Sequence, residues 1–315
     1  MGEFELIGEI TKVFTQTPSV MLGPGDDAAQ LSTPHGSVLA SSDILVEGVH
    51  FRCEWTTAFE LGRRAAAQNF ADITAMGCNP RALLVSVAAP ASTAQEWFID
   101  LARGLQAECD HVGASVIGGD LSSADSIVVS VTVLGDPSGG IPVTRSGAKV
   151  GDVVAVAGRL GWSAMGLAAL DRGIQVAPEL TAAYRVPTPP YAAGPAGRAA
   201  GATAMIDVSD GLLADAAHIA DASGVTIVLE RLLLAPDDVV VRAAASLGLD
   251  PLTAVLTGGE DHGILATFPQ SSPQGLHVPE PMFRVIGRVI ARGADAVLLD
   301  GRPYSGQKGH DHFSA

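Results

Sequence analysis

Acidic residues that stand beside glycine or small polar residues recur along this sequence, and they decide what chemistry it can support. A single turn of this kind is an ordinary surface feature, since Asp and Gly are common turn residues. Here six stretches share the pattern: residues 23–29 (GPGDDAA), 41–43 (SSD), 69–72 (NFAD), 118–120 (GGD), 207–211 (DVSDG) and 258–261 (GGED). Carboxylates, rather than imidazoles or thiolates, are the ligands that hard cations such as Mg²⁺ prefer. The sequence therefore predicts a metal and phosphate site.

A cluster of this many acids would hold several ions. Mg²⁺ keeps several waters and takes only one or two carboxylates per ion, and its other ligands are often substrate phosphates. Without cations, two carboxylates about 4 Å apart repel by roughly 1 kcal/mol in water and by about 4 kcal/mol at an effective dielectric constant of 20. We therefore expect cations to fill the cluster.

Other phosphate-binding and hydrolytic motifs do not fit. A P-loop needs Gly-Lys-Ser/Thr, and none of Lys12, Lys149 and Lys308 follows a glycine. Residues 23–28 loosely match a dinucleotide-binding fingerprint, but that motif opens a helix, and Pro34 and Gly36 soon interrupt any helix here. The Gly-x-Ser-x-Gly elbow of many hydrolases is absent.

Composition excludes further classes. The formal net charge of −15 repels nucleic acid. The sequence shows no apolar run of membrane length and no signal-peptide layout at its start, so we expect a cytoplasmic protein that binds no membrane. Three widely spaced cysteines match neither a disulfide framework nor a zinc site, and we expect them to be small buried thiols.

Helical and strand patterns alternate in both halves of the sequence, which predicts two domains, each α/β or α+β. The Gly-, Pro- and Ser-rich residues 135–149 resemble a linker, so we expect the domains to cover residues 1–148 and 149–315. In the first half, helices are expected at 3–14, 57–76 and 92–112, the last with a capping-box-like start. Strands are expected at 37–42, ending at Asp43, and at 81–89, 114–117 and 126–134, with residues 118–120 as a turn.

In the second half, we expect strands at 152–157, 204–207, 226–229, 263–268, 283–290 and 296–299. Helices are expected up to about residue 172 and at 180–200, 212–222 and 237–246. Ser209 or Asp210 can cap the helix at 212–222, whose N-terminal amides would form an anion site. Asp215, one turn further along, is expected to be solvated.

Taken in order, these stretches resemble the thiamine-monophosphate kinase family, in the aminoimidazole-ribonucleotide-synthetase-like superfamily. The resemblance runs nearly end to end and rests on GEFELI, GPGDDAA, SSDILVEGVHF, QNFADITAMGCNP, IGGD, VTRSGAK, IDVSDGL, TGGED and the final GHDHF. It implies ATP-driven, Mg²⁺-dependent phosphorylation of thiamine monophosphate to the diphosphate. It also implies an N-terminal α/β domain, whose sheet joins that of a second copy in a barrel, and a C-terminal α+β domain. The protein would therefore be a homodimer.

The resemblance assigns roles to matching positions. It implies that the magnesium ligands are Asp27, Ser41, Ser42, Asp43, Asp72, Asp120, Asp207 and Asp210. ATP would contact Gly119, Asp120, Arg145 and Ser209, and thiamine monophosphate would contact His50, Glu260 and His310. Asp43, Asp120, Asp207 and Arg145 would carry catalysis, while Asp26 is expected only to brace its turn.

The chain departs from the family pattern at two places. The family usually reads GGEDYEL where this chain has GGEDHGI at residues 258–264, which changes the surroundings of Glu260. It usually has Trp or Tyr at the position of His310, which affects stacking on the substrate.

Two alternatives remain from the residues. A ring synthetase of the same superfamily would differ in the substrate half of the site, and Glu260, His50 and the GHDHF tail argue against it. A nonenzymatic protein that binds divalent cations would need neither Arg145 nor Ser209 at the start of a helix.

Overall fold

The computed structural model describes residues 3–24, 28–270, 278–306 and 309. The chain folds into two compact units, one of Met1–Ile73 and Cys78–Ile141, the other of Thr74–Gly77 and Pro142–Ala315. Each unit is described by itself below.

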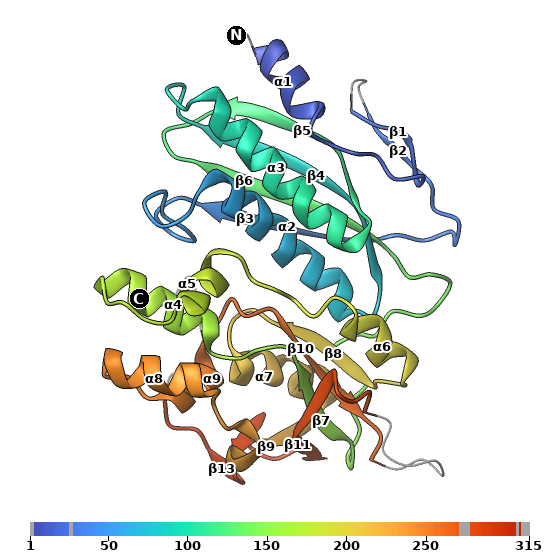
Figure 1. The fold of residues 1–315 in the computed structure, drawn as a ribbon. Helices are drawn as coiled ribbons and strands as arrows, with labels where there is room; N and C mark the ends of the chain where they lie inside the picture. The colour runs from blue at the N-terminus through green and yellow to red at the C-terminus, as the bar shows by residue number, and fades with distance from the viewer. Residues whose placement is uncertain (1–2, 25–27, 271–277, 307–308, 310–315) are drawn as a thin grey trace. The chain divides into compact units, whose positions relative to one another are not determined.

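The first unit contains three helices and six strands within its described residues: α1 (Glu3–Thr11), β1 (Val20–Leu22), β2 (Gln30–Leu31), β3 (Leu39–Val46), α2 (Ala58–Ala75), β4 (Asn79–Ala89), α3 (Gln95–Val112), β5 (Ser115–Ser123) and β6 (Val128–Asp136). Its main sheet has the strand order β3-β6-β4-β5 (Figure 1). β4 and β5 run parallel, whereas the other two pairs are antiparallel. β3 and β5 are thus the two edges of this sheet.

Two glycines allow α2 and α3 to approach each other closely. A Cβ atom on Gly62 of α2 would lie 2.1 Å from the carbonyl oxygen of Leu101. A Cβ atom on Gly104 of α3 would lie 2.0 Å from the carbonyl oxygen of Phe59. Any larger side chain would force the helices apart, because protein interiors are close-packed.

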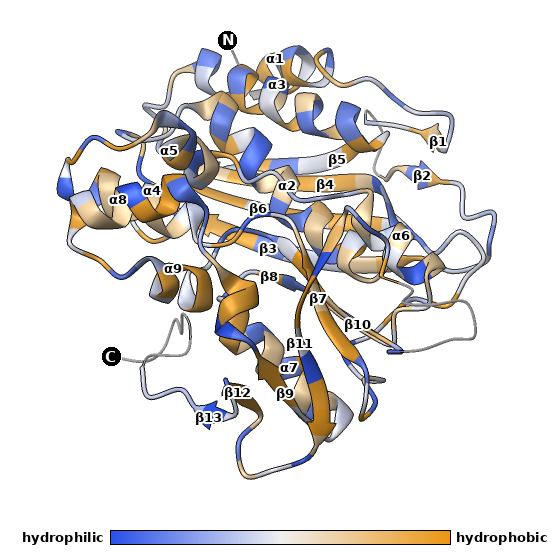
Figure 2. Ribbon diagram, turned by 60° about the horizontal axis from the view of Figure 1, so that its bottom comes forward, coloured by the Kyte–Doolittle hydropathy of each residue, from blue (hydrophilic) through white to orange (hydrophobic). Residues whose placement is uncertain are grey.

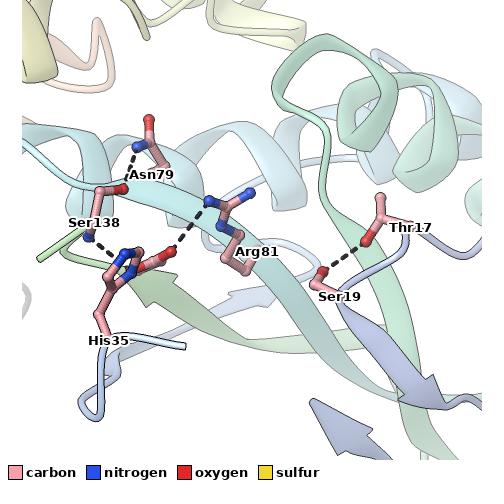
Figure 3. Close-up of polar contacts among 7 residues, drawn as sticks. Thr17, Ser19, His35, Asn79, Arg81 and Ser138 are labelled. Carbon is pink, nitrogen blue, oxygen red and sulfur yellow. Dashed lines mark hydrogen bonds and ion pairs between the residues drawn. The ribbon is translucent and has the colours of Figure 1, made fainter. Parts of the chain in front are cut away.

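A cluster of hydrogen-bonded polar residues surrounds Asp136 at the end of β6. The carboxylate of Asp136 accepts hydrogen bonds from the backbone N–H of Ser138 (2.7 Å) and from Arg81 of β4 (3.1 Å), and it lies 3.0 Å from Nδ1 of His35 (Figure 3). Asn79 in turn donates to the hydroxyl of Ser138 at 3.0 Å. Burial alone would raise the pKa of Asp136, but these partners outweigh it and lower the pKa.

The second unit alternates helices and strands. Its described elements are β7 (Val153–Ala157), α4 (Trp162–Arg172), α5 (Pro178–Arg185), α6 (Ala193–Ala199), β8 (Ala204–Val208), α7 (Leu212–Ser223), β9 (Val225–Leu229), the short 3₁₀ helix η1 (Arg231–Leu234), α8 (Asp238–Leu247), α9 (Pro251–Thr257), β10 (Gly263–Phe268), β11 (Phe283–Ala291), β12 (Val297–Leu299) and β13 (Arg302–Pro303). The strand order is β13-β12-β9-β11-β7-β10-β8, and only β12 and β9 pair in parallel among these strands.

Both faces of this sheet are buried. Val154 and Val156 of β7 pack in one core cluster with Leu212 and Ile219 of α7. Their neighbour Ala155 faces a second cluster, with Phe268 and Phe283. Because successive side chains of a strand point to opposite faces, such a strand is apolar throughout, and Figure 2 shows β7 and β9 coloured as hydrophobic. A third cluster joins α4, α5, α8 and α9.

Several expectations for the elements were wrong in detail. β3 continues through Asp43 to Val46, so Asp43 does not end a strand. Residues 118–120 lie inside β5 and are not a turn. α3 has Ala94 as its N-cap, without a side-chain hydrogen bond, so it has no capping box. The predicted helix at 180–200 is divided into α5 and α6, because Pro187, Pro189 and Pro190 cannot continue a helix.

Two further observations bear on the expectations. Cys78 and Cys109 are buried as expected, but Cys53 is exposed. Within the described ranges no single helix is long and apolar enough to span a membrane, although α8 and α9, bent by 111° at their junction, meet that criterion as a pair.

Candidate functional site

The first unit brings two of the predicted ligands together. The hydroxyl of Ser41 on β3 donates to Oδ2 of Asp72 on α2 at 2.6 Å. One turn before Asp72, the side-chain amide of Asn69 is buried and donates to the carbonyl of Ala65 in its own helix. Ser42, the next residue of β3, donates to the carbonyl of Val131 at 3.0 Å. Among these groups, the hydroxyl of Ser41 and the carboxylate of Asp72 are the pair in direct contact. Ser42 follows Ser41 directly in the strand, so its side chain points to the opposite face of the sheet.

The other predicted ligands of this unit lie further away. Asp43 pairs with Val131 in β6, whereas Gly119 and Asp120 pair with Val85 and Ser86 in β4. Two strands separate β3 from β5, and neighbouring strands lie about 4.8 Å apart, so the backbones of Asp43 and Asp120 are about 14 Å apart across the sheet. One chain thus does not place these two carboxylates on a common ion.

Gly119 is a glycine for a steric reason. A Cβ atom there would lie 1.8 Å from the carbonyl oxygen of Val85. The backbone of β5 therefore passes too close to β4 for any side chain. Gly119 and its neighbour Asp120 are both exposed.

His50 follows β3 in a tight turn. Its backbone N–H donates to the carbonyl of Val46 at 2.9 Å, and its ring Nδ1 accepts the N–H of the same residue at 3.0 Å. In the neutral imidazole this leaves the proton on Nε2. The turn fixes the ring, and the ring carries a donor on its other side.

In the second unit, the turn after β8 carries Asp207, Ser209 and Asp210. Neither Ser209 nor Asp210 caps α7: the N-cap is Gly211, at φ 117°, without a side-chain hydrogen bond. Oδ2 of Asp215 instead accepts the backbone N–H groups of Ser209, Asp210 and Gly211, each at 3.1 Å. The three amides of the turn just before α7 thus bind the chain's own carboxylate.

The expectation that Asp215 is solvated was therefore wrong, since only 2% of this residue is exposed. Burial and the nearby carboxylates of Asp207 and Asp210 raise the pKa of Asp215 to about 7, although its backbone hydrogen bonds act in the opposite direction. Its neighbours in sequence are alanines (residues 214, 216 and 217), so nothing local indicated this role.

The loop between α9 and β10 lies against this turn. The N–H of Glu260 donates to the carbonyl of Ser209 at 2.7 Å, and the N–H of His262 donates to that of Val208 at 2.9 Å. Asp261, between them, accepts the N–H groups of Gly161 (2.5 Å) and Ser163 (2.9 Å) at the start of α4. Burial raises the pKa of Asp261 to about 7 against the effect of these bonds.

His262 lies between two predicted site carboxylates. Its Nδ1 is 3.2 Å from Oδ2 of Asp207, and its Nε2 is 3.9 Å from Oε2 of Glu260. Burial lowers the pKa of His262, but the carboxylates of Asp207 and Glu260 outweigh it and raise the pKa to about 10. The departure from the family pattern at this position thus places an imidazolium inside the site.

Among the described contacts, Arg145 is held through its backbone. Its side chain is exposed, and its carbonyl accepts the hydroxyl of Ser223 at the end of α7 (3.1 Å). The same hydroxyl accepts the N–H groups of Gly147 and Ala148. The backbone of this segment is thus held by Ser223, and Arg145 itself is exposed.

Two predicted site residues, Asp27 and His310, lie outside the described residues, as does Asp26. Among the residues that are described, no group of three or more His, Cys, Asp or Glu side chains is arranged to hold a metal ion. The donor atoms are nevertheless carboxylate and hydroxyl oxygens, which suit Mg²⁺ by their chemistry.

Comparison with known proteins shows which proteins this chain resembles in sequence and fold. The family models "AIR synthase related protein, N-terminal domain" and "C-terminal domain" match residues 25–136 and 149–300. The thiamine-monophosphate kinase of Mycobacterium tuberculosis (strain H37Rv) is 47% identical over 99% of this chain and 92% of its own length. That of Stenotrophomonas maltophilia K279a has a solved structure with a TM-score of 0.83, at 30% identity over 96% and 98% of the two chains. A structure described as AaThiL complexed with AMPPCP and TMP gives a TM-score of 0.80, at 30% identity over 99% and 97%.

Proposed function

The chain belongs to the thiamine-monophosphate kinases of the AIR synthase related protein family, and from this premise we propose how its residues perform the reaction. The enzyme phosphorylates thiamine monophosphate at the expense of ATP and yields thiamine diphosphate. The observation that carries the assignment is the likeness over nearly the full length to relatives of that name, one of them solved with AMPPCP and TMP.

The reaction needs little help from a base. The nucleophile is an oxygen of a phosphate monoester, whose second pKa is about 6, so it is already ionised at pH 7. A new P–O bond forms to this oxygen while the bond between the γ-phosphorus and the ADP oxygen breaks. The main barrier is repulsion between two anions, so catalysis consists of positioning and charge neutralisation. Free thiamine is an alcohol, whose attack requires a general base to remove its proton, so we expect it to be a poorer acceptor than the monophosphate.

We assign Mg²⁺ to the oxygen donors of Asp27, Ser41, Ser42, Asp43, Asp72, Asp120, Asp207 and Asp210, as several ions. Their chemistry fits a hard cation, and the contact between Ser41 and Asp72 supports the pairing of β3 with α2. Mg²⁺, when bound, neutralises phosphate oxygens and lowers the repulsion between the two substrates. Asp43, Asp120 and Asp207 thus act on the reaction through charge.

The remaining site residues are assigned to contacts with the two substrates. Gly119 and Asp120, which are exposed on the edge strand β5, would contact ATP together with Ser209. Arg145 is also exposed, and its guanidinium would bind a phosphate of ATP. His50 and Glu260 would contact thiamine monophosphate, because a carboxylate attracts the cationic thiazolium ring. His310 is assigned to the same substrate.

We further propose a homodimer in the cytoplasm, with domains 1–148 and 149–315. The sheet of the first unit exposes Ile44 (51%) and Leu84 (39%), and apolar side chains and free strand edges on a sheet favour association. If the β5 edge of one copy lies beside the β3 edge of its partner, Asp120 of one subunit comes near the partner subunit's Asp43. The two carboxylates that one chain keeps apart would then serve one site.

Mixing two inactive variants tests this arrangement. Asp43→Asn and Asp120→Asn chains, unfolded together and refolded, should regain about a quarter of wild-type activity, because half of the dimers are mixed and each mixed dimer has one intact site of two. Each variant refolded alone is the control. A mixture no more active than its components, or a monomeric mass at micromolar concentration, would refute the shared site.

The activity itself is tested by ATP consumption with and without thiamine monophosphate. We expect turnover only with thiamine monophosphate and Mg²⁺, with thiamine diphosphate as product. A ring synthetase would leave thiamine monophosphate unchanged, and a cation-binding protein would consume no ATP.

A further inference from the structure

His262 is a buried donor between two carboxylates of different assigned roles. Its side chain is 6% exposed, that of Asp207 is 8% exposed, and that of Glu260 is 38% exposed. Nδ1 of His262 is within hydrogen-bond distance of Asp207, at 3.2 Å. Nε2, at 3.9 Å from Glu260, is beyond that distance, and it is buried with no hydrogen-bond partner in the described part of the chain.

An imidazole suits this position because its two nitrogens lie on opposite edges of one rigid ring. An N–H left unsatisfied in the interior costs free energy, so Nε2 favours any arrangement in which the Glu260 carboxylate moves closer. Glu260 is the more exposed of the two acids and is therefore the one that can move. Asp207, in β8, is held by the pairing of that strand with β10.

The backbone shows that the loop is held in this conformation at a cost. Glu260 has φ of 66° and His262 has φ of 50°, in the left-handed region that residues other than glycine rarely adopt. The hydrogen bonds from their N–H groups to Ser209 and Val208, and those from Gly161 and Ser163 to Asp261, maintain it. Strain supported in this way is typical of functional loops.

We propose that His262 is a positioning residue: its Nδ1 fixes the carboxylate of Asp207 toward the metal, and its Nε2 sets the place of Glu260 toward the thiamine substrate. The proposal rests on the proposed function and deepens it, since one ring links the groups for the two substrates. His262 itself touches neither substrate.

Two variants distinguish the contact of Nδ1 with Asp207 from the effect of Nε2 on Glu260. In His262→Asn the side-chain amide reaches the place of Nδ1 but not that of Nε2. We expect the KM for thiamine monophosphate to rise about three- to tenfold, which corresponds to one hydrogen bond, with kcat and the Mg²⁺ requirement within about twofold of wild type. In His262→Gln the amide reaches the place of Nε2. There we expect a near-normal KM, but a Mg²⁺ concentration for half-activation raised about three- to tenfold.

Binding of AMPPCP with Mg²⁺, measured by calorimetry, gives a second readout that needs no turnover. The Gln variant should bind it more weakly than the Asn variant. The same two substitutions at His218, which is exposed on α7, are the matched controls and should change neither constant. The double variant His262→Asn/Glu260→Gln should show no larger rise in KM than Glu260→Gln alone, because residues that act together are not additive.

The inference is overturned if the Asn and Gln variants shift the same constants equally, or if both alter only the melting temperature. If the two variants fold poorly, the single variant Glu260→Gln provides the test. An unchanged KM for thiamine monophosphate in this variant would refute the proposed connection between His262 and the substrate through Glu260. If the wild-type protein does not phosphorylate thiamine monophosphate, the proposed function fails by itself. The AMPPCP arm then still tests the Asp207 contact, and equal affinities of the Asn and Gln variants refute it.

Discussion

The hydroxyl of Ser41 donates to the carboxylate of Asp72 at 2.6 Å and so joins β3 to α2. Ser41→Ala removes this donor, and we expect the Mg²⁺ concentration for half-activation to rise about three- to tenfold, because the carboxylate is no longer oriented. The measurement is activity against Mg²⁺ concentration. Ser246→Ala, at an exposed hydroxyl on α8 that bonds only within its helix in the described contacts, is the control. A loss of stability without a changed Mg²⁺ requirement would assign the contact to folding alone.

Removing charge at the sheet edges should abolish catalysis without unfolding the protein. For Asp43→Asn and Asp120→Asn we expect turnover to fall by roughly a hundredfold or more, because each loses a charge that holds metal, while the circular dichroism spectrum stays unchanged. Asp100→Asn, on the exposed part of α3, serves as the matched substitution. Undiminished turnover of both variants at saturating Mg²⁺ would contradict the metal assignment.

Asp136 should protect the protein against acid. Its pKa is lowered in the folded state, so the carboxylate contributes stability above its unfolded pKa of about 3.9, and this contribution is lost as the pH falls through the lower folded pKa. Asp136→Asn should therefore lower the free energy of unfolding by about 1–3 kcal/mol at pH 7, with a difference that shrinks below about pH 4.

Denaturant melts of both forms from pH 2.5 to 7 measure this difference. Asp125→Asn, at an exposed site, is the control and should show no such dependence. If the difference in the free energy of unfolding between the two forms stayed constant over this pH range, the contacts of Asp136 would stabilise the protein by packing and not by charge.

A methyl group added at Gly104, where α3 contacts α2, should destabilise the protein. Gly104→Ala places a Cβ against the carbonyl of Phe59, and we expect a loss of about 1–3 kcal/mol in the free energy of unfolding. Gly8→Ala in α1, where a Cβ meets nothing within 4 Å, should be neutral or stabilising by up to about 1 kcal/mol, because alanine favours helix. Equal effects at the two sites in urea melts would exclude a steric role for Gly104.

His310 provides a test outside the described residues. If its ring stacks on the thiazolium, protonation below its reference pKa of about 6.5 adds a repelling charge. The KM for thiamine monophosphate should then rise below about pH 6.5, and His310→Trp should remove this rise. Identical profiles of the two forms from pH 5.5 to 8 would withdraw His310 from the site.

Much of the fold could be read from the sequence because the strands of the second unit are apolar throughout. β10, for example, has the predicted bounds, Gly263–Phe268. Residues 118–120 were misread because two successive glycines usually indicate a turn. In β5 they serve close contact with β4, which depends on tertiary pairing. The break before α6 was visible in Pro187, Pro189 and Pro190 and should have been predicted.

The site was harder to predict than the fold. Individual residues could be assigned by resemblance, but the contacts between them join segments far apart in sequence. Asp261 bonds to the start of α4, about a hundred residues away, and no local pattern indicates such a partner. In the sequence, His262 differs from the family pattern, but this difference does not indicate a partner. Its contact with Asp207 depends on the pairing of β8 with β10.

The internal bonds of Asp215 bear on the design of inhibitors. Because its carboxylate already occupies the amides of Ser209, Asp210 and Gly211, an ATP-competitive compound gains little from an anionic group aimed at the turn before α7. Such a group would meet another carboxylate in place of unused donors. A neutral hydrogen-bonding group directed at the hydroxyl of Ser209 avoids that repulsion.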